Sequence, residues 1–431
     1  GNNVSLTGTI GSSAAAALVK VGLGTLTGTT NNTGGLTVNA GQVNLTGWAN
    51  SPNNTLTVNS GGVLQFGAGG DQRALAGPLI GPTAPVMLTP VVVNAGGLLL
   101  QNNTFSTVPL GPLTLAGGTY NATNSSQGFG PYALTGTVTV NGTQTSAINN
   151  TSGTVIPLGA LNVANALDST FTVTFDVADS AVGTDLLVTG SNGFGNGVLV
   201  GNNSNTDRRT SNLVKTGAGT MVLGGTNFYT GSTRIDSGTL ELGEGGTRGS
   251  LSTASAITGS AGSTLVFNRS DRIGSGTAFA STIAGGLNVA QRGLGTTVLS
   301  GSNTYTGTTS VTAGVLQIGS GGTVGSVSSS STLVLGSGQL AVSRSDAFTQ
   351  DFANTLLVGA GSVSGGAANT VNFGTITRSS GGTLVIPTTG TFITSSPNVN
   401  GMLAGITFGG TTWAVSNGVG AITGLATGSY T

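Results

Sequence analysis

The chain contains neither cysteine nor histidine, and these two absences exclude much of the common chemistry of protein sites. Without cysteine there is no disulfide and no thiolate zinc site. Without histidine there is no Ser-His-Asp or Cys-His catalytic arrangement, no imidazole metal ligand and no side chain that ordinarily titrates near neutral pH. The sequence therefore indicates no cofactor and no metal.

Charge is also scarce, at 6% of 431 residues, and the 12 basic and 12 acidic side chains balance to a formal net charge of zero. Nucleic acid and anionic membranes bind clustered Lys and Arg, whereas here only Arg208 and Arg209 are adjacent. No nucleic-acid partner is expected, and no apolar run is long enough to span a membrane. Weak charge repulsion between copies favours self-association.

Glycine is abundant instead, at 77 residues, and Val, Leu and Ile occur in short bursts at every second position. In "TLELG", Leu240 and Leu242 share one face and Glu241 points the other way. In "VLQIG", Leu316 and Ile318 alternate with a glutamine in the same manner. This period of two is typical of strands with one buried face, and no glycine-free period of 3.6 indicates a helix.

The bursts belong to a long internal repeat. "LVKTGAGTMVLGGTNFYTGSTRIDSGTLELG" at 213–243 returns as "VAQRGLGTTVLSGSNTYTGTTSVTAGVLQIG" at 289–319, and a partial third copy lies near 18–47. Both full copies carry an Asn-x-Tyr-Thr-Gly turn, which supplies the repeat-turn residues Asn227, Tyr229, Gly231, Asn303, Tyr305 and Gly307. A glycine precedes each strand at intervals of about 23 to 24 residues, as at Gly238, Gly262, Gly314, Gly338 and Gly361.

One strand recurs per glycine interval, glycines lie at the corners, and no helix is indicated. This pattern is typical of a coil in which each circuit adds one strand to each of several parallel sheets. The corner glycines are expected to supply a positive φ or a tight bend at little steric cost. We therefore predict an all-β fold, a single parallel β-helix over 1–431. A β-sandwich is the alternative, although sandwiches seldom repeat their sequence. No capping helix is indicated, so both ends of the coil are expected to be open to end-to-end stacking.

The segments 213–243 and 289–319 closely resemble the autotransporter-associated β-strand repeat, and 18–47 resembles it in part. The family is found in bacterial passenger domains and in very large surface proteins. The resemblance implies a right-handed β-helix, export from the cell, and a location at the bacterial cell surface or in the extracellular space.

The regular spacing of the glycines is interrupted in the N-terminal half. The interval from Gly61 to Gly96 leaves about 15 residues beyond one circuit. This Pro-rich insertion at 76–90 is either a contact arm for a neighbouring subunit or ligand, or a loop lying on its own coil; its candidate contact residues are Pro78, Leu79, Ile80, Pro82, Pro85, Val86, Met87, Leu88 and Pro90. An irregular outgrowth is predicted at 102–157.

Candidate chemistry is sparse. The acidic residues Asp168, Asp176, Asp179 and Asp185 could hydrolyse a glycoside or bind calcium, but solvated turn aspartates are the favoured interpretation, with Asp176 on the solvent face of a strand. Arg269-Ser-Asp271 and Arg344-Ser-Asp346 are best interpreted as ion pairs within the repeat. Tyr229, Tyr305, Trp48 and Trp413 could present aromatic faces to sugars, or pack on the flank of the coil.

These observations favour a non-enzymatic extracellular structural protein, a rod-like subunit or segment of a bacterial surface fibre or layer. An adhesin passenger that binds glycans or surfaces is the alternative, and a β-helix polysaccharide-degrading enzyme is the third.

Overall fold

The computed structural model describes residues 3–10, 17–30, 34–48, 54–66, 89–101, 109–123, 133–150, 156–159, 170–190, 194–195, 210–251, 255–273 and 279–426. Within these ranges the chain forms strands and turns and no helix, so the all-β expectation is confirmed. None of the described residues forms a helix that could cross a membrane. Two compact units are present: Gly1–Gly238 with Gly249–Ser255, and Thr239–Arg248 with Ala256–Thr431.

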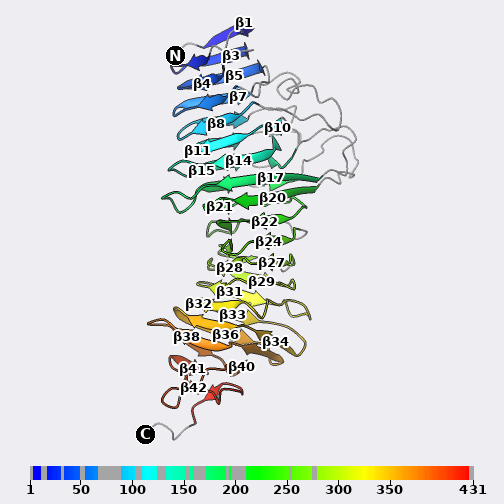
Figure 1. Ribbon diagram of the computed structural model, residues 1–431, viewed down its shortest axis with the longest axis vertical. Helices are drawn as coiled ribbons and strands as arrows, with labels where there is room; N and C mark the ends of the chain where they lie inside the picture. Colours follow the sequence, from blue (N-terminus) through cyan, green and yellow to red (C-terminus); the bar gives the residue numbers. More distant parts are fainter. Residues whose placement is uncertain are drawn as a thin grey trace. The chain divides into compact units, whose positions relative to one another are not determined.

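The first unit is a coil whose successive circuits are stacked in chain order (Figure 1). One ladder contains β1 (Val4–Ile10), β3 (Thr25–Thr30), β5 (Gly41–Trp48), β7 (Gly62–Phe66), β9 (Leu98–Gln101), β12 (Thr119–Ala122), β15 (Ser146–Asn150), β18 (Leu186–Thr189) and β21 (Thr220–Leu223). A second contains β2 (Leu18–Lys20), β4 (Leu36–Val38), β6 (Leu56–Val58), β8 (Val91–Asn94), β11 (Leu113–Ala116), β14 (Gly136–Val140), β17 (Thr170–Val177), β20 (Thr210–Thr216) and β22 (Thr233–Ile235). Two short parallel pairs complete it: β10 (Pro109–Leu110) with β13 (Ala133–Leu134), and β16 (Ile156–Pro157) with β19 (Phe194–Gly195).

The second unit has the same construction. Its ladders contain β23 (Thr239–Leu242), β25 (Thr264–Phe267), β28 (Asn288–Gln291), β30 (Thr309–Val311), β32 (Thr332–Leu335), β35 (Asn354–Leu357) and β38 (Thr375–Arg378); β24 (Ile257–Gly259) and β27 (Ile283–Gly285); and β34 (Phe348–Asp351), β37 (Asn369–Asn372) and β40 (Thr391–Ile393). A further ladder contains β26 (Arg272–Ile273), β29 (Thr296–Leu299), β31 (Val315–Ile318), β33 (Gln339–Val342), β36 (Ala360–Gly365), β39 (Thr383–Ile386), β41 (Ile406–Phe408), β42 (Thr412–Val415) and β43 (Thr423–Gly424).

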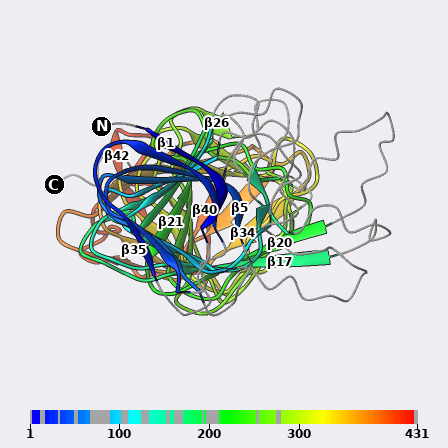
Figure 2. The same cartoon turned by 90° about the horizontal axis from the view of Figure 1, so that it is seen from above.

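The described strands from β1 to β41 pair in parallel within their sheets, which confirms the expected parallel β-helix, agrees with the right-handed coil, and excludes an antiparallel sandwich. β17 and β20 are the longest neighbouring pair, and they extend side by side past the strands around them (Figures 1 and 2).

The core of each coil is a set of columns in which inward side chains of successive circuits lie directly above one another. In the first unit, one column contains Leu36, Leu56, Val91, Leu113, Val138 and Phe175, which are neighbours in register, and each is at most 2% exposed. Each circuit therefore covers the apolar surface left by the one before it, which is the main source of stability in a stacked repeat.

Outward positions form polar ladders instead. Asn59 donates a hydrogen bond from its amide to Asn39 of the preceding circuit, and Asn94 donates to Asn59, both at 2.6 Å. These asparagines form an amide ladder, which adds direct side-chain pairing between circuits to the backbone ladder.

The parallel run ends near the C-terminal end of the second unit. β42 pairs antiparallel with β41, and β43 pairs antiparallel with β42. The amide of Ile422 donates to the carbonyl of Phe392 in β40 at 2.6 Å, so this segment also contacts the last parallel circuit. The expectation that both ends of the coil are open does not hold here, because an antiparallel strand covers the edge of β41.

The range 102–157, interpreted above as an irregular outgrowth, contains regular strands in its described parts. β11, β12, β14 and β15 all lie in it and pair in register with their neighbours. β12 follows an Ala-Gly-Gly corner like the one before β9, with Gly117 at φ 79° and Gly96 at φ 74°, so the glycine signal is present for this strand, whereas the turns before β11, β14 and β15 have other sequences.

The corner glycines act in two ways. Gly238, Gly262 and Gly314 have φ values of 68°, 86° and 55°, which confirms the expected left-handed conformation. Gly338 and Gly361 do not have a positive φ, but a β-carbon on either would lie 2.7 or 2.6 Å from an inward aliphatic side chain. Backbone conformation explains the first group and lack of space explains the second.

Gly314 and Gly262 separate these two effects within one unit. A β-carbon on Gly314 would overlap the carbonyl oxygens of Gly293 and Gly295, whereas one on Gly262 would meet nothing within 4 Å. Gly262→Ala should lower the free energy of unfolding by about 1–2 kcal/mol, the cost of a left-handed residue with a β-carbon. Gly314→Ala should cost about 2–5 kcal/mol because overpacking is added. Urea unfolding followed by circular dichroism measures both, and equal costs would contradict the role given to the close approach.

Candidate functional site

The Asn-x-Tyr-Thr-Gly turn directs its Asn and Tyr into the coil, while the x and Thr positions between them are exposed. The Asn303 side-chain amide is 2% exposed and bridges three circuits: its nitrogen donates to the carbonyls of Gly301 and Ser326, both at 2.9 Å, and its oxygen accepts from the amide of Ile283 at 3.0 Å. Asn227 makes the equivalent two donor contacts, at 3.0 and 2.9 Å. The repeated asparagine therefore satisfies backbone groups at a corner where the sheet ladder is interrupted.

The tyrosines of the same turns are fully buried. Tyr229 shares a 2.7 Å hydrogen bond with the Thr233 hydroxyl, and Tyr305 does the same with Thr309. Burial raises the pKa of both phenols. The sequence analysis expected these rings either to face a sugar or to pack on the flank of the coil. Both expectations were wrong, because both rings are part of the core.

The glycines that close the motif have no space for a side chain. A β-carbon on Gly231 would overlap the Ser211 carbonyl, and one on Gly307 would overlap the Leu287 carbonyl. All six repeat-turn residues named from the sequence therefore lie in the interior stacking of circuits and not on a ligand-binding surface.

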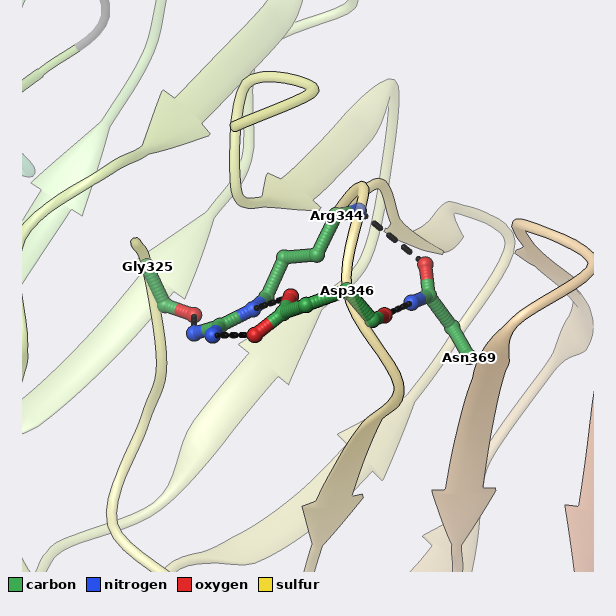
Figure 3. A network of polar contacts seen from close by, with 4 residues as sticks. All are labelled: Gly325, Arg344, Asp346 and Asn369. Atoms are coloured by element: carbon green, nitrogen blue, oxygen red, sulfur yellow. Dashed lines mark hydrogen bonds and ion pairs between the residues drawn. The ribbon is translucent and has the colours of Figure 1, made fainter. Parts of the chain in front are cut away.

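The Arg-Ser-Asp motif forms an intra-repeat ion pair, as expected, and the structure adds further contacts (Figure 3). Arg344 donates from Nε and Nη2 to the two carboxylate oxygens of Asp346, at 2.9 and 2.6 Å, and from Nη1 to the Gly325 carbonyl at 3.0 Å. Asn369 of the next circuit accepts from the Arg344 amide and donates to the Asp346 carbonyl. The guanidinium hydrogen bonds lower the pKa of the Asp346 carboxyl.

Arg269 and Asp271 repeat this bidentate pair at 2.8 and 2.7 Å. The arginine side chains are only 13% and 12% exposed in the two copies, and each packs over the glycine that ends the preceding strand, Gly243 or Gly319. The motif is therefore a clamp on the corner of the preceding circuit, and its charges are used within the repeat.

Lys215 of β20 is a buried structural position that the sequence interpretation missed. Its side chain is fully buried, and its ammonium donates to the carbonyls of Thr216 and Gly217, both at 2.8 Å, and of Ser237 at 3.2 Å. Loss of water around the ammonium lowers the pKa of Lys215 to about 8, although two nearby aspartates act in the opposite direction.

The equivalent position in the other copies makes the same kind of contact. Lys20 donates to three turn carbonyls, and the Gln291 amide donates to Gly293 at 2.7 Å and Gly295 at 3.2 Å. A polar donor two residues before the first glycine of each Gly-x-Gly turn is the signal from which Lys215 could have been found.

Asp185 is buried and not solvated, contrary to the sequence interpretation. It is 3% exposed; one carboxylate oxygen accepts from the Ser180 amide and hydroxyl at 2.9 and 2.5 Å, and the other from the Thr220 amide at 2.8 Å. Two contacts are within the turn and the third is to β21 of the next circuit, so this carboxylate joins the turn to the neighbouring circuit.

The remaining acidic residues show no shared site. Asp176 is exposed on β17, as predicted, and accepts a 3.0 Å hydrogen bond from the Thr216 hydroxyl. Asp179 is also exposed, and Asp168 lies outside the described residues. Among the residues that the structure describes, no group of three or more acidic side chains could hold a metal ion.

The candidate contact residues Pro78, Leu79, Ile80, Pro82, Pro85, Val86, Met87 and Leu88 lie outside the described residues. Pro90 is described, and its carbonyl accepts a 2.9 Å hydrogen bond from the Leu56 amide. It is therefore part of the circuit that leads into β8.

Comparison with known proteins places the repeat in a described family. Residues 213–242 and 289–318 match the passenger-associated-transport-repeat family. A segment of 87 residues is 38% identical to the adhesin BmaC autotransporter of Brucella suis biovar 1 (strain 1330), covering 20% of this chain and 2% of that protein. The chain thus corresponds to a small fraction of this relative's length. No solved structure matches the chain.

Replacement of Lys215 tests the carbonyl contacts. Lys215→Met leaves buried carbonyls without their donor and should lower the free energy of unfolding by about 2–4 kcal/mol. Lys215→Gln should cost less than about 1.5 kcal/mol, since Gln291 supplies such contacts in the other copy. Urea unfolding measures both variants. Equal losses for Met and Gln would show that the carbonyl contacts are unimportant.

The lowered pKa of Lys215 also predicts a pH dependence. The folded pKa of about 8 lies below the ordinary value of 10.5, so the unfolded chain binds more protons between these values and stability rises with pH there. The raised tyrosine pKa values act oppositely above about pH 10. The difference in unfolding free energy between wild type and Lys215→Gln should therefore grow from pH 8 to pH 10. A flat difference would contradict the assigned cause.

Proposed function

Because the chain is an autotransporter passenger-type repeat protein of the bacterial cell surface or extracellular space, we propose that it is a non-enzymatic adhesive passenger segment. The coil is the structural part, and outward side chains and insertions contact a glycan or another surface.

The interior position of the repeated residues is the observation that carries this proposal. The Asn and Gly of the repeated turn are used between circuits, as are Lys215, Asp185 and the Arg-Asp clamps, while the Tyr is buried and bonded within its own turn. A repeat whose polar groups are used internally maintains a scaffold, so contacts with other molecules are left to the positions that differ from circuit to circuit.

The insertion after β7 fits a division between scaffold residues and contact residues. β7 ends at Phe66 and β8 begins at Val91, yet β6 pairs directly with β8 and β7 with β9, without a change of register. The circuits on either side of the insertion therefore stack as closely as elsewhere. We assign the contacts to this segment because the coil keeps its register without it, and the relative that carries the name adhesin supports adhesion as their purpose.

Deletion of residues 76–88 tests the adhesive role, because it keeps Thr89 and Pro90 before β8. The variant should retain the unfolding midpoint of the wild type and lose at least about tenfold in affinity for immobilised glycans or fixed cells that the wild type binds, a loss typical of removing a contact centre. Surface plasmon resonance with a panel of neutral and charged glycans measures this. A wild-type chain that binds no glycan and no cell surface would refute the proposal.

Assembly into a surface fibre is the second candidate, favoured by exposed apolar side chains beside β2: Val19, Val21 and Leu23 are 51%, 68% and 82% exposed. The antiparallel β42 argues against strand-on-strand stacking at the other end of the described chain. Sedimentation of the same deletion variant separates the two roles, since a fibre-joining arm would lose assembly and an adhesive arm would lose binding.

A further inference from the structure

The turn between β42 and β43 contains an Asn-Gly pair. In such a pair the asparagine side chain can react with its own backbone, because glycine has no side chain to block the approach. Asn-Gly pairs occur at 141–142, 192–193, 196–197, 400–401 and 417–418, and those at 192–193 and 196–197 lie outside the described residues. The structure distinguishes the other pairs by their backbone contacts and by the space around the glycine.

The Asn417 side chain is held over the peptide bond that follows it. Its Oδ1 accepts a hydrogen bond from the Val419 amide at 3.1 Å, which closes a ring of atoms that includes Cγ and the Gly418 nitrogen. The side chain also lies over Gly420, where a β-carbon would be 2.9 Å from Oδ1 and 3.4 Å from Cγ. The carbon that can be attacked is therefore kept beside the nitrogen that can attack it.

The same contacts favour the electronic change that this attack requires. The Val419 amide donates to the oxygen on which negative charge develops when Cγ is attacked. The Gly418 amide donates to Ser416 Oγ at 3.0 Å, so the proton that leaves the nitrogen already has an acceptor. Asn417 is exposed, and a β-carbon on Gly418 would meet nothing within 4 Å, so there is space for water and for a ring.

The other two described pairs have a more constrained backbone. Asn400 lies in a tight turn with a φ of 53°, and the flanking residues Val399 and Met402 exchange two backbone hydrogen bonds. Gly142 packs against the preceding circuit, where a β-carbon would be 2.9 Å from the carbonyl carbon of Ala116. Ring closure requires the backbone to move, so both pairs are less suited to it than the pair at 417–418.

We propose that Asn417 is a site of spontaneous modification, at which the side-chain amide becomes a carboxylate through a cyclic imide. The Gly418 nitrogen loses its proton through Ser416 to solvent and forms a bond to Cγ. The bond from Cγ to Nδ2 then breaks, and Nδ2 takes a proton from solvent and leaves as ammonia. Water opens the imide at either carbonyl, which gives aspartate or isoaspartate. The net reaction consumes one water and releases one ammonia.

Either product changes the segment that covers the edge of β41. Both products add a negative charge to a chain whose formal net charge is zero. Isoaspartate also adds a side-chain carbon to the backbone of the turn that joins the antiparallel strands β42 and β43. This inference concerns the chemistry of one turn and does not rest on the proposed adhesive function.

Peptide mapping by mass spectrometry of the native full chain, incubated at neutral pH, tests the site. Chymotryptic cleavage after Trp413 separates Asn417 from Asn400. A mass gain of about 1 Da, the exchange of an amide for an acid, should accumulate at Asn417 at least about threefold faster than at Asn141 or Asn400. In the urea-unfolded chain this advantage should disappear. A native rate at Asn417 no higher than at the other two, or the same advantage in urea, overturns the proposal.

Two variants test the contacts themselves. Ser416→Ala removes the acceptor of the amide proton and Gly420→Ala displaces the asparagine side chain, so each should slow the native reaction at Asn417 by about threefold or more. Ser345→Ala changes an exposed serine of the same unit outside this turn and should leave the rate unchanged. Circular dichroism checks that each variant keeps its strand content. Native rates equal to that of the wild type in both turn variants would contradict the assigned mechanism.

Discussion

Direct stacking of one backbone circuit on the next, about 4.8 Å apart, is the constraint on which this structure depends. At that spacing the carbonyl oxygens of one turn form the floor beneath the next turn. Gly314 lies against the carbonyls of Gly293 and Gly295, and Gly238 lies against those of Gly217 and Gly219 in the same way. The corner glycines are therefore required by the neighbouring circuit as much as by their own φ.

Stacking also creates a need for polar groups inside the coil. At a corner the chain changes direction and its carbonyls leave the sheet ladder, so each must find another donor. Asn303 supplies two donors and one acceptor at such a corner, and Lys215 or Gln291 supplies donors at another. A buried ammonium and a buried amide can replace one another there because the turn requires donors and does not require charge. This explains why polar residues recur at these corner positions in an otherwise apolar interior.

Alternation and spacing in the sequence predicted the strands and their parallel stacking well, because a period of two and a regular glycine are local features that stacking preserves. β23 and β31 were predicted in this way from "TLEL" and "VLQI". The depth of the turn residues could not be predicted. Tyr305 lies in a Gly- and Thr-rich stretch that is typical of a surface turn, and only the folded turn places its hydroxyl beside Thr309, four residues ahead.

Polar pairing across circuits could not be predicted from the sequence either, because it also depends on how the turns fold. Asp185 is followed by no recognisable motif, and its partner Thr220 lies 35 residues away, a distance set by the lengths of the intervening turns. The antiparallel reversal at β42 was missed because Thr412–Val415 has the same alternation as the parallel strands before it. The direction in which a strand pairs depends on the turn before it, and alternation does not contain that information.

The difference between inward and outward positions indicates where specificity for a ligand can arise. Inward and corner positions are constrained by the circuit on either side, so a change there affects stability before it affects any ligand. Outward positions face water, and most of those in the described ladders are Thr, Asn, Ser or short aliphatic residues, as in the row from Asn39 through Asn59 to Asn94. Trp413 departs from that composition at a position where the fold does not require an aromatic ring. Folding alone does not explain a large ring that is 42% exposed at an outward position.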